Sequence, residues 1–232
     1  MSGSHTDEQL RTLLVACTKF RGAEAPAGYP NGLALCVIDS VQSPAVRYAS
    51  VGCVLDRYRA YRRAQGGKPS TDGVSQLLAT FAELGGPDAW AASIGNRHRT
   101  STRSGVLKAE AIRDAAAVLA AEGLKTTAAL RTAGADPPRM ARAEARWRTV
   151  PGQRSGITWR YLLMLAGIPG VKPDRMICRF VADALGIPRG NLPPAFALAI
   201  LTEAAETMQM SPTALDHAVW QYQRARHTNG VR

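Results

Sequence analysis

Apolar residues recur at helical spacing in one segment after another of this 232-residue chain, and Gly and Pro mark the breaks between segments. No segment alternates apolar and polar residues in a β-branched run, which is the pattern of a half-buried strand. The clearest helices are a run after Thr6, which can form a capping box with Gln9, and a nearly all-apolar run at 32–41. The sequence therefore predicts an all-α fold with a buried helix near its centre.

Composition limits the class of protein further. Hydrophobic residues make up 46% of the chain and charged residues 20%, which excludes an intrinsically disordered protein. No stretch reaches the ~18 uncharged apolar residues that a membrane span needs. The amino-terminal residues also lack the basic-then-apolar order of a secretory signal. We expect a monomeric cytoplasmic protein with no membrane partner.

The charge balance points to a polyanionic partner. The chain has 29 Lys and Arg against 18 Asp and Glu, a net charge of +11, which predicts binding to nucleic acid and association with the nucleoid. Of the basic residues 24 are arginine, which suits bidentate phosphate contacts but equally fits a GC-rich genome. The four cysteines and four histidines have no metal-ligand spacing, so no metal, iron–sulfur cluster or other cofactor is predicted.

Several short segments carry a resemblance to a known family. They are Ile38-Asp39-Ser40-Val41-Gln42, Ser93-Ile94-Gly95-Asn96 followed by Lys108-Ala109 and Ile112, Val150-Pro151-Gly152, and Asp174 followed by Ile177 and Arg179. Pro151 and Asp174 lie 23 residues apart, which matches the spacing in that family. In these residues the chain resembles the helix-hairpin-helix DNA glycosylases, the superfamily that includes endonuclease III and the adenine glycosylases. The similarity spans about residues 31–181.

The resemblance implies a fold and an activity. The fold would have a central helical lobe at 25–140 and a second lobe made of 1–24 plus 141–232, with a DNA groove between them. The activity would be monofunctional hydrolysis of the N-glycosidic bond of a modified or damaged base, flipped out of duplex DNA. Asp174 would be the catalytic residue, because a carboxylate stabilises the positive charge that develops on the sugar. Its simpler interpretation, an N-cap of the following helix, is compatible with catalysis, because backbone N–H groups hold a capping aspartate rigidly.

The same resemblance suggests DNA contacts. Gln42 would fill the gap that a flipped base leaves, unless it only caps its own helix. The other expected DNA-binding residues are Arg97, Arg99 and Arg103 in a basic loop, Gly152, Arg154, Ser155 and Gly156 in the hairpin, and Lys172. Asp39, Trp159 and Tyr161 are weaker candidates for a base pocket. Aromatic residues at helical spacing are more often part of the core.

The sequence departs from the family pattern at informative positions. Arg154 stands where the hairpin normally has a second glycine, and Gly156 stands where bifunctional members have a nucleophilic lysine. Met176 replaces a frequent histidine, and no cysteine cluster follows Cys178. We therefore predict no lyase step and no iron–sulfur cluster. A second hairpin register at 168–171 matches the motif letter for letter but places no acid at the catalytic offset.

Two other functions remain open at this stage. A DNA-binding protein without catalysis is favoured if Asp174 proves to be salt-bridged and distant from any pocket. A basic helical interaction protein that binds RNA or an acidic partner is favoured if the positive surface does not line the groove. The sequence does not identify the recognised base, since pocket shape decides that specificity.

Overall fold

The computed structural model describes residues 5–229, with side chains as far as Arg226. In this range the regular structure consists of twelve α-helices and two short 3-10 helices, with no strand and one isolated antiparallel bridge between Arg99 and Leu107. The prediction of an all-α fold is confirmed. None of the helices between residues 5 and 229 has both the length and the apolar character that a membrane crossing requires.

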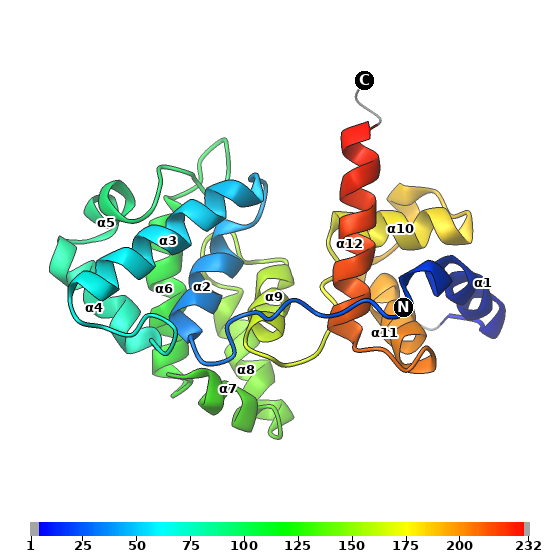
Figure 1. The fold of residues 1–232 in the computed structure, drawn as a ribbon, viewed down its shortest axis with the longest axis horizontal. Coiled ribbons are helices and arrows are strands. Elements are labelled where there is room, and N and C mark those ends of the chain that lie inside the picture. The colour runs from blue at the N-terminus through cyan, green and yellow to red at the C-terminus, as the bar shows by residue number, and fades with distance from the viewer. Residues whose placement is uncertain (1–4, 230–232) are drawn as a thin grey trace. The chain divides into compact units, whose positions relative to one another are not determined.

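The helices follow one another along the chain as labelled in Figure 1. They are α1 (Asp7–Cys17), α2 (Leu33–Gln42), α3 (Tyr48–Ala64), α4 (Val74–Leu84), α5 (Pro87–Ser93), α6 (Lys108–Ala121), α7 (Thr127–Ala133), α8 (Pro137–Trp147), α9 (Ile157–Leu165), α10 (Arg175–Leu185), α11 (Pro194–Thr207) and α12 (Pro212–Asn229), with 3-10 turns at Thr18–Phe20 and Arg189–Asn191.

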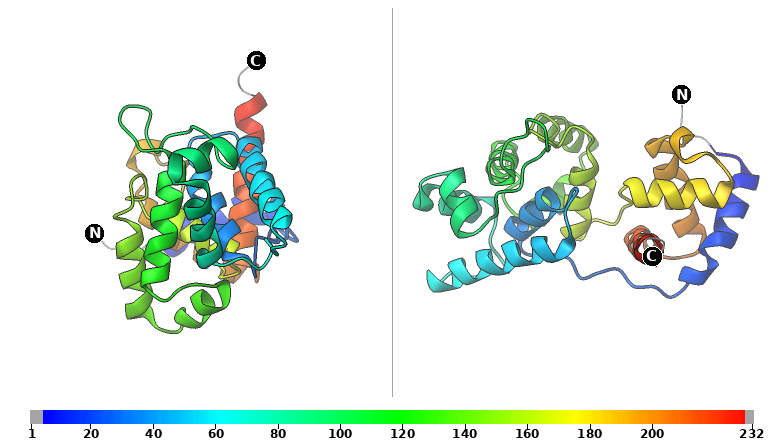
Figure 2. Two further views of the ribbon diagram at one scale, coloured as in Figure 1. Left: turned by 90° about the vertical axis from the view of Figure 1, so that its left-hand side faces the viewer. Right: turned by 90° about the horizontal axis from the view of Figure 1, so that it is seen from above.

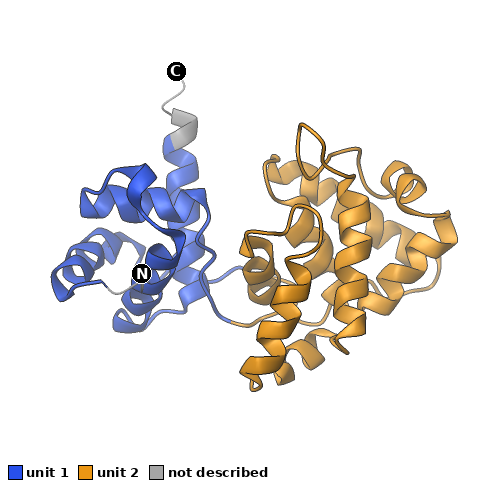
Figure 3. Ribbon diagram, turned by 180° about the vertical axis from the view of Figure 1, so that it is seen from behind, with its two compact units in different colours: residues 1–26, 169–232 blue, residues 27–168 orange. Residues whose placement is uncertain are grey.

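The chain forms two compact units, coloured separately in Figure 3. The terminal unit consists of Met1–Pro26 and Pro169–Arg232, and the central unit of Ala27–Ile168. This division differs from the expected one at its second boundary, because residues 141–168 belong to the central unit. The reason is packing, since α8 lies against α6 and α9 lies against α2. As a result the hairpin segment and Asp174 lie in different units.

Helix α2 is the centre of the central unit, and all ten of its residues are buried. It packs against α3, α4, α6 and α9, and Figures 1 and 2 show it enclosed by helices. Its sequence explains the position, because an apolar helix without a polar face gains stability only where other helices cover every side. Trp147 and Trp159 pack against each other in this core, with ring centroids 5.7 Å apart.

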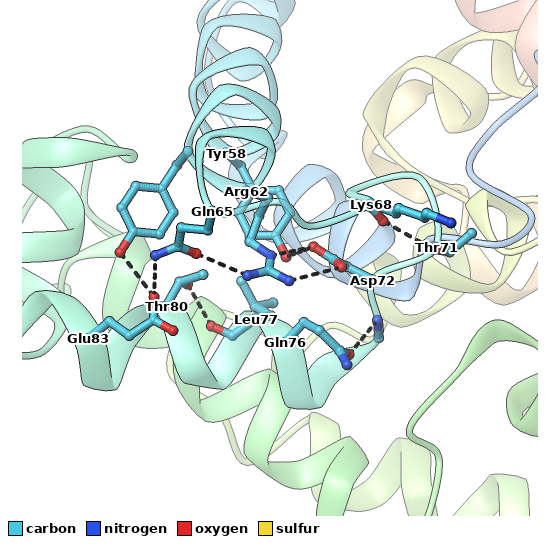
Figure 4. A network of polar contacts seen from close by, with 12 residues as sticks. Tyr58, Arg62, Gln65, Lys68, Thr71, Asp72, Gln76, Leu77, Thr80 and Glu83 are labelled. Carbon is cyan, nitrogen blue, oxygen red and sulfur yellow. Dashed lines mark hydrogen bonds and ion pairs between the residues drawn. The ribbon is translucent and has the colours of Figure 1, made fainter.

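A polar network joins the end of α3 to helix α4 and to the loop before it (Figure 4). The guanidinium of Arg62 donates to the carboxylate of Asp72 at 2.7 Å, and the Tyr58 hydroxyl donates to the same oxygen at 2.9 Å. The Gln65 amide donates to exposed Glu83 at 2.8 Å. Because buried Asp72 has both a cation and a phenol as partners, this network stabilises the loop 65–73.

The terminal unit has its own core. Helix α1 packs against α10 and α11, and α12 packs against α10 and α11, so the two ends of the chain share one bundle. Leu13 of α1, Phe180 of α10, Ile200 of α11 and Leu215 of α12 are buried there. The capping box predicted at the start of α1 is present, with reciprocal bonds between Thr6 and Gln9.

Candidate nucleic-acid interface

The turn between α2 and α3 is fixed by a buried lysine. The Lys108 ammonium donates to the carbonyl oxygens of Gln42 at 2.7 Å and Pro44 at 2.6 Å. Lys108 is 3% exposed, and burial lowers its pKa to about 8. An ammonium at the end of α2 satisfies carbonyls that have no helical partner. The turn also contains Ala45 with φ +59°, a left-handed conformation that costs energy for a residue with a Cβ.

The basic loop between α5 and α6 starts beside this turn. The Lys108 backbone N–H donates to the carbonyl of His98 at 2.8 Å, and the Thr100 N–H donates to Val106 at 2.9 Å. These bonds join the two ends of the loop 96–106, so the loop is short and closed at its base. The three arginines predicted to contact DNA are all exposed on it, namely Arg97, Arg99 and Arg103.

The turn between α8 and α9 contacts the basic loop. Gly152, at φ +81°, lies so close to Thr100 that an added Cβ would be 2.7 Å from the Thr100 Cβ. Behind it, buried Gln153 accepts a hydrogen bond from the Thr158 hydroxyl at 2.6 Å, which anchors the turn to α9. The chain thus forms two helices joined by a turn at 137–165, with Gly156 as the left-handed residue just before α9.

Three segments far apart in sequence therefore lie together. Lys108 joins the α2–α3 turn to the basic loop, and the contact between Thr100 and Gly152 joins that loop to the hairpin. We call their exposed arginines the arginine surface: Arg47, Arg97, Arg99, Arg103, Arg148 and Arg154. Within the part of the chain that the structure describes, none of the six forms an ion pair with a carboxylate. Two of the six donate to backbone carbonyls, Arg99 to Gly105 and Arg148 to Arg154, both at 2.9 Å.

A buried carboxylate lies beneath the α2–α3 turn. Asp39 is 0% exposed and accepts hydrogen bonds from Tyr29 at 2.9 Å, Tyr48 at 3.0 Å and Ser43 at 2.8 Å. Burial raises the pKa of Asp39, while the donated hydrogen bonds, including one from Tyr161, lower it. Asp39 and Tyr161, two of the three candidates for a base pocket, are thus brought together. Trp159, the third, is 2% exposed and belongs to the core.

Gln42 does not face solvent. Its side chain is 0% exposed, and both polar atoms of its amide are buried without a hydrogen-bond partner. This differs from the expected insertion into DNA, and the physical reason is that α2 is enclosed on all sides as far as its last residue. The amide does not cap the helix either, because Lys108 holds that position.

Asp174 lies in the terminal unit as the N-cap of α10. One carboxylate oxygen accepts from the Met176 and Ile177 N–H groups at 2.8 and 3.1 Å, and the other accepts from the Lys172 ammonium at 2.9 Å. Lys172 also donates its backbone N–H to Asp216 at 2.9 Å. Asp216 is 1% exposed, and burial raises its pKa to about 7, while the positive charge of Lys172 opposes the shift.

The terminal unit also contains a surface cavity of about 410 Å³. Residues 21–25 and 208–211 form most of its walls, together with Ala214 of α12. Neither Asp174 nor Lys172 lines this cavity. The predicted catalytic residue is therefore paired with a lysine and lies outside the described pocket.

A family model described as a domain of unknown function, DUF8548, matches residues 11–224. The chain belongs to this family. The DUF8548 match extends over both compact units, so the arginine surface and the Asp174 cluster both lie within the family domain. No curated protein and no solved structure matches the chain.

Three residues at or beside the arginine surface of this DUF8548 member were not expected from the sequence. Arg47 and Arg148 were not among the expected DNA contacts, although each adjoins a Pro- or Gly-containing turn. Tyr48 was missed as well, and with 43% of its surface exposed it is the most exposed aromatic residue among those described. Tyr48 could have been noticed in the sequence, because it stands at the start of a helix directly after the turn that begins at Pro44.

Proposed function

We propose that this protein binds DNA through the arginine surface of its central unit. The observation that carries the proposal is the contact between three segments, which places on neighbouring turns six described arginines that form no ion pair with a carboxylate. Guanidinium groups bind phosphate oxygens bidentately, and a backbone of regularly spaced phosphates suits several of them at once.

The hairpin supports phosphate binding in a second way. The turn residues Arg154 and Ser155 are exposed directly before the amino terminus of α9, where helical N–H groups lack helical partners. The dipole of a helix favours an anion at this end. Arg154 adds a full positive charge where the related hairpins have a glycine. We infer that a side-chain contact here replaces a close approach of the backbone.

We propose binding without base excision. The Asp174 carboxylate would have to stabilise the developing charge on a sugar. It already forms an ion pair with Lys172 and accepts two backbone hydrogen bonds. Both hydrogen bonds are those of a helix-capping aspartate with a structural role. Of the functions that the sequence left open, DNA binding without catalysis therefore has the strongest support.

The proposal is tested with labelled duplex DNA and two variants of equal charge. Replacing Arg97, Arg99 and Arg103 by alanine should weaken binding strongly. A control that replaces Arg11, Arg63 and Lys125 removes the same charge from exposed positions elsewhere and should weaken it much less. Equal losses in the two variants would show that net charge alone governs binding, and would overturn the assignment of the surface.

Catalysis is tested separately with oligonucleotides that carry a panel of base lesions. After incubation, alkali cleaves any abasic site, so base release is seen directly as strand breaks. We expect no breaks above the level without protein. Release of any base that is lost in the Asp174→Asn variant would replace the binding function by a glycosylase function.

A further inference from the structure

The α2–α3 turn presents an aromatic ring at the edge of the arginine surface. Tyr48, the first residue of α3, is one of two large apolar side chains that are exposed among the described residues, and the other, Val15, lies in the terminal unit. Exposing an aromatic ring to water forfeits the stabilisation that burial of its carbon atoms would give. A partner that covers the ring would recover it.

The orientation of this ring is set from within the protein. The Tyr48 hydroxyl donates to Asp39 at 3.0 Å, and the same carboxylate oxygen accepts from Tyr29 at 2.9 Å. The other oxygen accepts from Ser43 at 2.8 Å, within the turn itself. A carboxylate held by these donors and by Tyr161 is a rigid anchor, so the phenol end of Tyr48 is fixed although the residue is 43% exposed.

The backbone beneath the ring is equally constrained. Lys108 binds the carbonyls of Gln42 and Pro44 at the start of the turn, and Ala45 keeps a left-handed conformation. Strained backbone of this kind persists only where the surrounding structure determines it, and it occurs often at binding sites. The Tyr48 side chain is thus already ordered before a ligand binds, which reduces the entropy cost of binding.

The neighbourhood identifies the chemistry of the partner. Arg47 is exposed next to Tyr48, and Lys108 links the turn to the basic loop that carries Arg97 and Arg99. The positive charge selects a polyanion, and a partly exposed aromatic side chain favours a planar ring as its partner. Nucleobases in an intact duplex are stacked on one another, so only an unpaired base can lie against the ring.

We propose that Tyr48 is a stacking residue for an unpaired DNA base, and that Asp39 positions it. The proposal rests on the proposed function, since the arginine surface supplies the phosphate contacts on either side of the base. Stacking adds a preference for DNA with an unpaired base, which phosphate contacts alone cannot give. The protein distinguishes DNA with an unstacked base from an intact duplex.

The test compares an intact duplex with the same duplex carrying a short single-stranded gap that contains 2-aminopurine, whose fluorescence falls when it stacks. The protein should quench this fluorescence and bind the gapped DNA more tightly. Tyr48→Ala should abolish the quenching and weaken the affinity for the gapped DNA by about tenfold, as is typical for loss of one stacked base. Its affinity for the intact duplex should be unchanged. Tyr48→Trp keeps an aromatic ring but lacks the phenol that Asp39 anchors, so it should retain part of the quenching.

Two further variants separate stacking from folding. Tyr61→Phe removes a phenol that donates to Glu83, away from the turn, and it should quench normally. Asp39→Asn should reduce the quenching, whereas the same change made together with Tyr48→Phe should add nothing to the effect of Tyr48→Phe alone. That non-additivity is expected of a residue that acts through Tyr48, and additive effects would overturn its positioning role.

The outcomes distinguish this inference from the proposed function. Binding to duplex DNA together with equal behaviour of wild type and Tyr48→Ala on the gapped DNA would overturn the stacking role alone. Absence of binding to either DNA would overturn the proposed function. Quenching that survives in Tyr48→Ala would assign the stacking to another residue.

Discussion

Replacing Gly152 by alanine should separate the hairpin from the basic loop. At φ +81° any Cβ is strained, which costs about 1–2 kcal/mol for an L-residue. The new Cβ would also lie 2.7 Å from the Thr100 Cβ and 3.0 Å from its Cγ2, closer than atoms pack. Overpacking of this size costs a further ~1–3 kcal/mol. We therefore expect a total loss of about 2–5 kcal/mol, together with weaker DNA binding.

The assay is denaturant unfolding of the variant beside a matched glycine replacement. Gly66 has φ +73° at the end of α3, and a Cβ there would meet nothing within 4 Å. Gly66→Ala should therefore show only the conformational cost of about 1–2 kcal/mol and normal DNA binding. The difference between the two variants measures the contact with Thr100.

A second change at Thr100 tests whether its contact with residue 152 causes the loss of stability. Thr100→Gly removes every atom that the new Cβ would meet and should restore much of the stability of Gly152→Ala, whereas Thr100→Ala keeps the Cβ and should restore little. Equal stability of Gly152→Ala and Gly66→Ala would mean that the hairpin and the loop do not touch as described. The same holds if both Thr100 variants rescue equally.

Three other predictions concern buried and paired charges. Because the folded pKa of Asp216 is raised to about 7, its contribution to the free energy of unfolding falls as pH rises from about 4 to 7. In urea unfolding, Asp216→Asn should therefore be more stable than the wild type by up to a few kcal/mol at about pH 8, and should differ little from it at about pH 4. Lys108→Met leaves two buried carbonyls without a donor and should cost about 1–4 kcal/mol. Since the folded pKa of Lys108 is lowered to about 8, that cost should grow towards about pH 9.5, and a cost that shrinks would contradict the assignment. Asp174→Asn keeps the capping oxygen, so it should change stability by no more than ~1 kcal/mol and leave DNA affinity unaltered in an anisotropy titration.

Local patterns in the sequence predicted most of the helices. The apolar run at 32–41 indicated the buried helix α2, and the pair Gly66-Gly67 indicated the end of α3, which the structure places at Ala64. Thr6 and Gln9 form the expected capping box. These features depend on residues within one or two turns of each other, so periodicity and capping chemistry are sufficient to detect them.

The division into units could not be read in the same way. It depends on α8 and α9 packing against α6 and α2, contacts between residues far apart in sequence. The Pro- and Gly-rich segment 168–173 carried the signal, since the boundary falls between Ile168 and Pro169. The sequence analysis treated part of this segment as an alternative hairpin, because a linker and a tight turn have the same composition.

The candidate site was predicted in part. The basic loop and the hairpin were both expected to contact DNA, and the structure places them against each other through Thr100 and Gly152. Gln42 was expected at the surface, but it is buried because α2 is covered as far as its last residue. Nothing in the local pattern distinguishes a covered helix end from an exposed one, and for the same reason the exposed ring of Tyr48 was missed.

The central claim, DNA binding by the arginine surface, is tested most directly by the salt dependence of duplex affinity. If the six arginines each neutralise one phosphate, log K should fall against log[salt] with a slope of about −5, and Arg97/Arg99/Arg103→Ala should make that slope shallower by about 2 to 3. The control at Arg11, Arg63 and Lys125 should leave the slope nearly unchanged. A slope near zero for the wild type, or the same slope for the wild type and the variant at 97, 99 and 103, would contradict the claim.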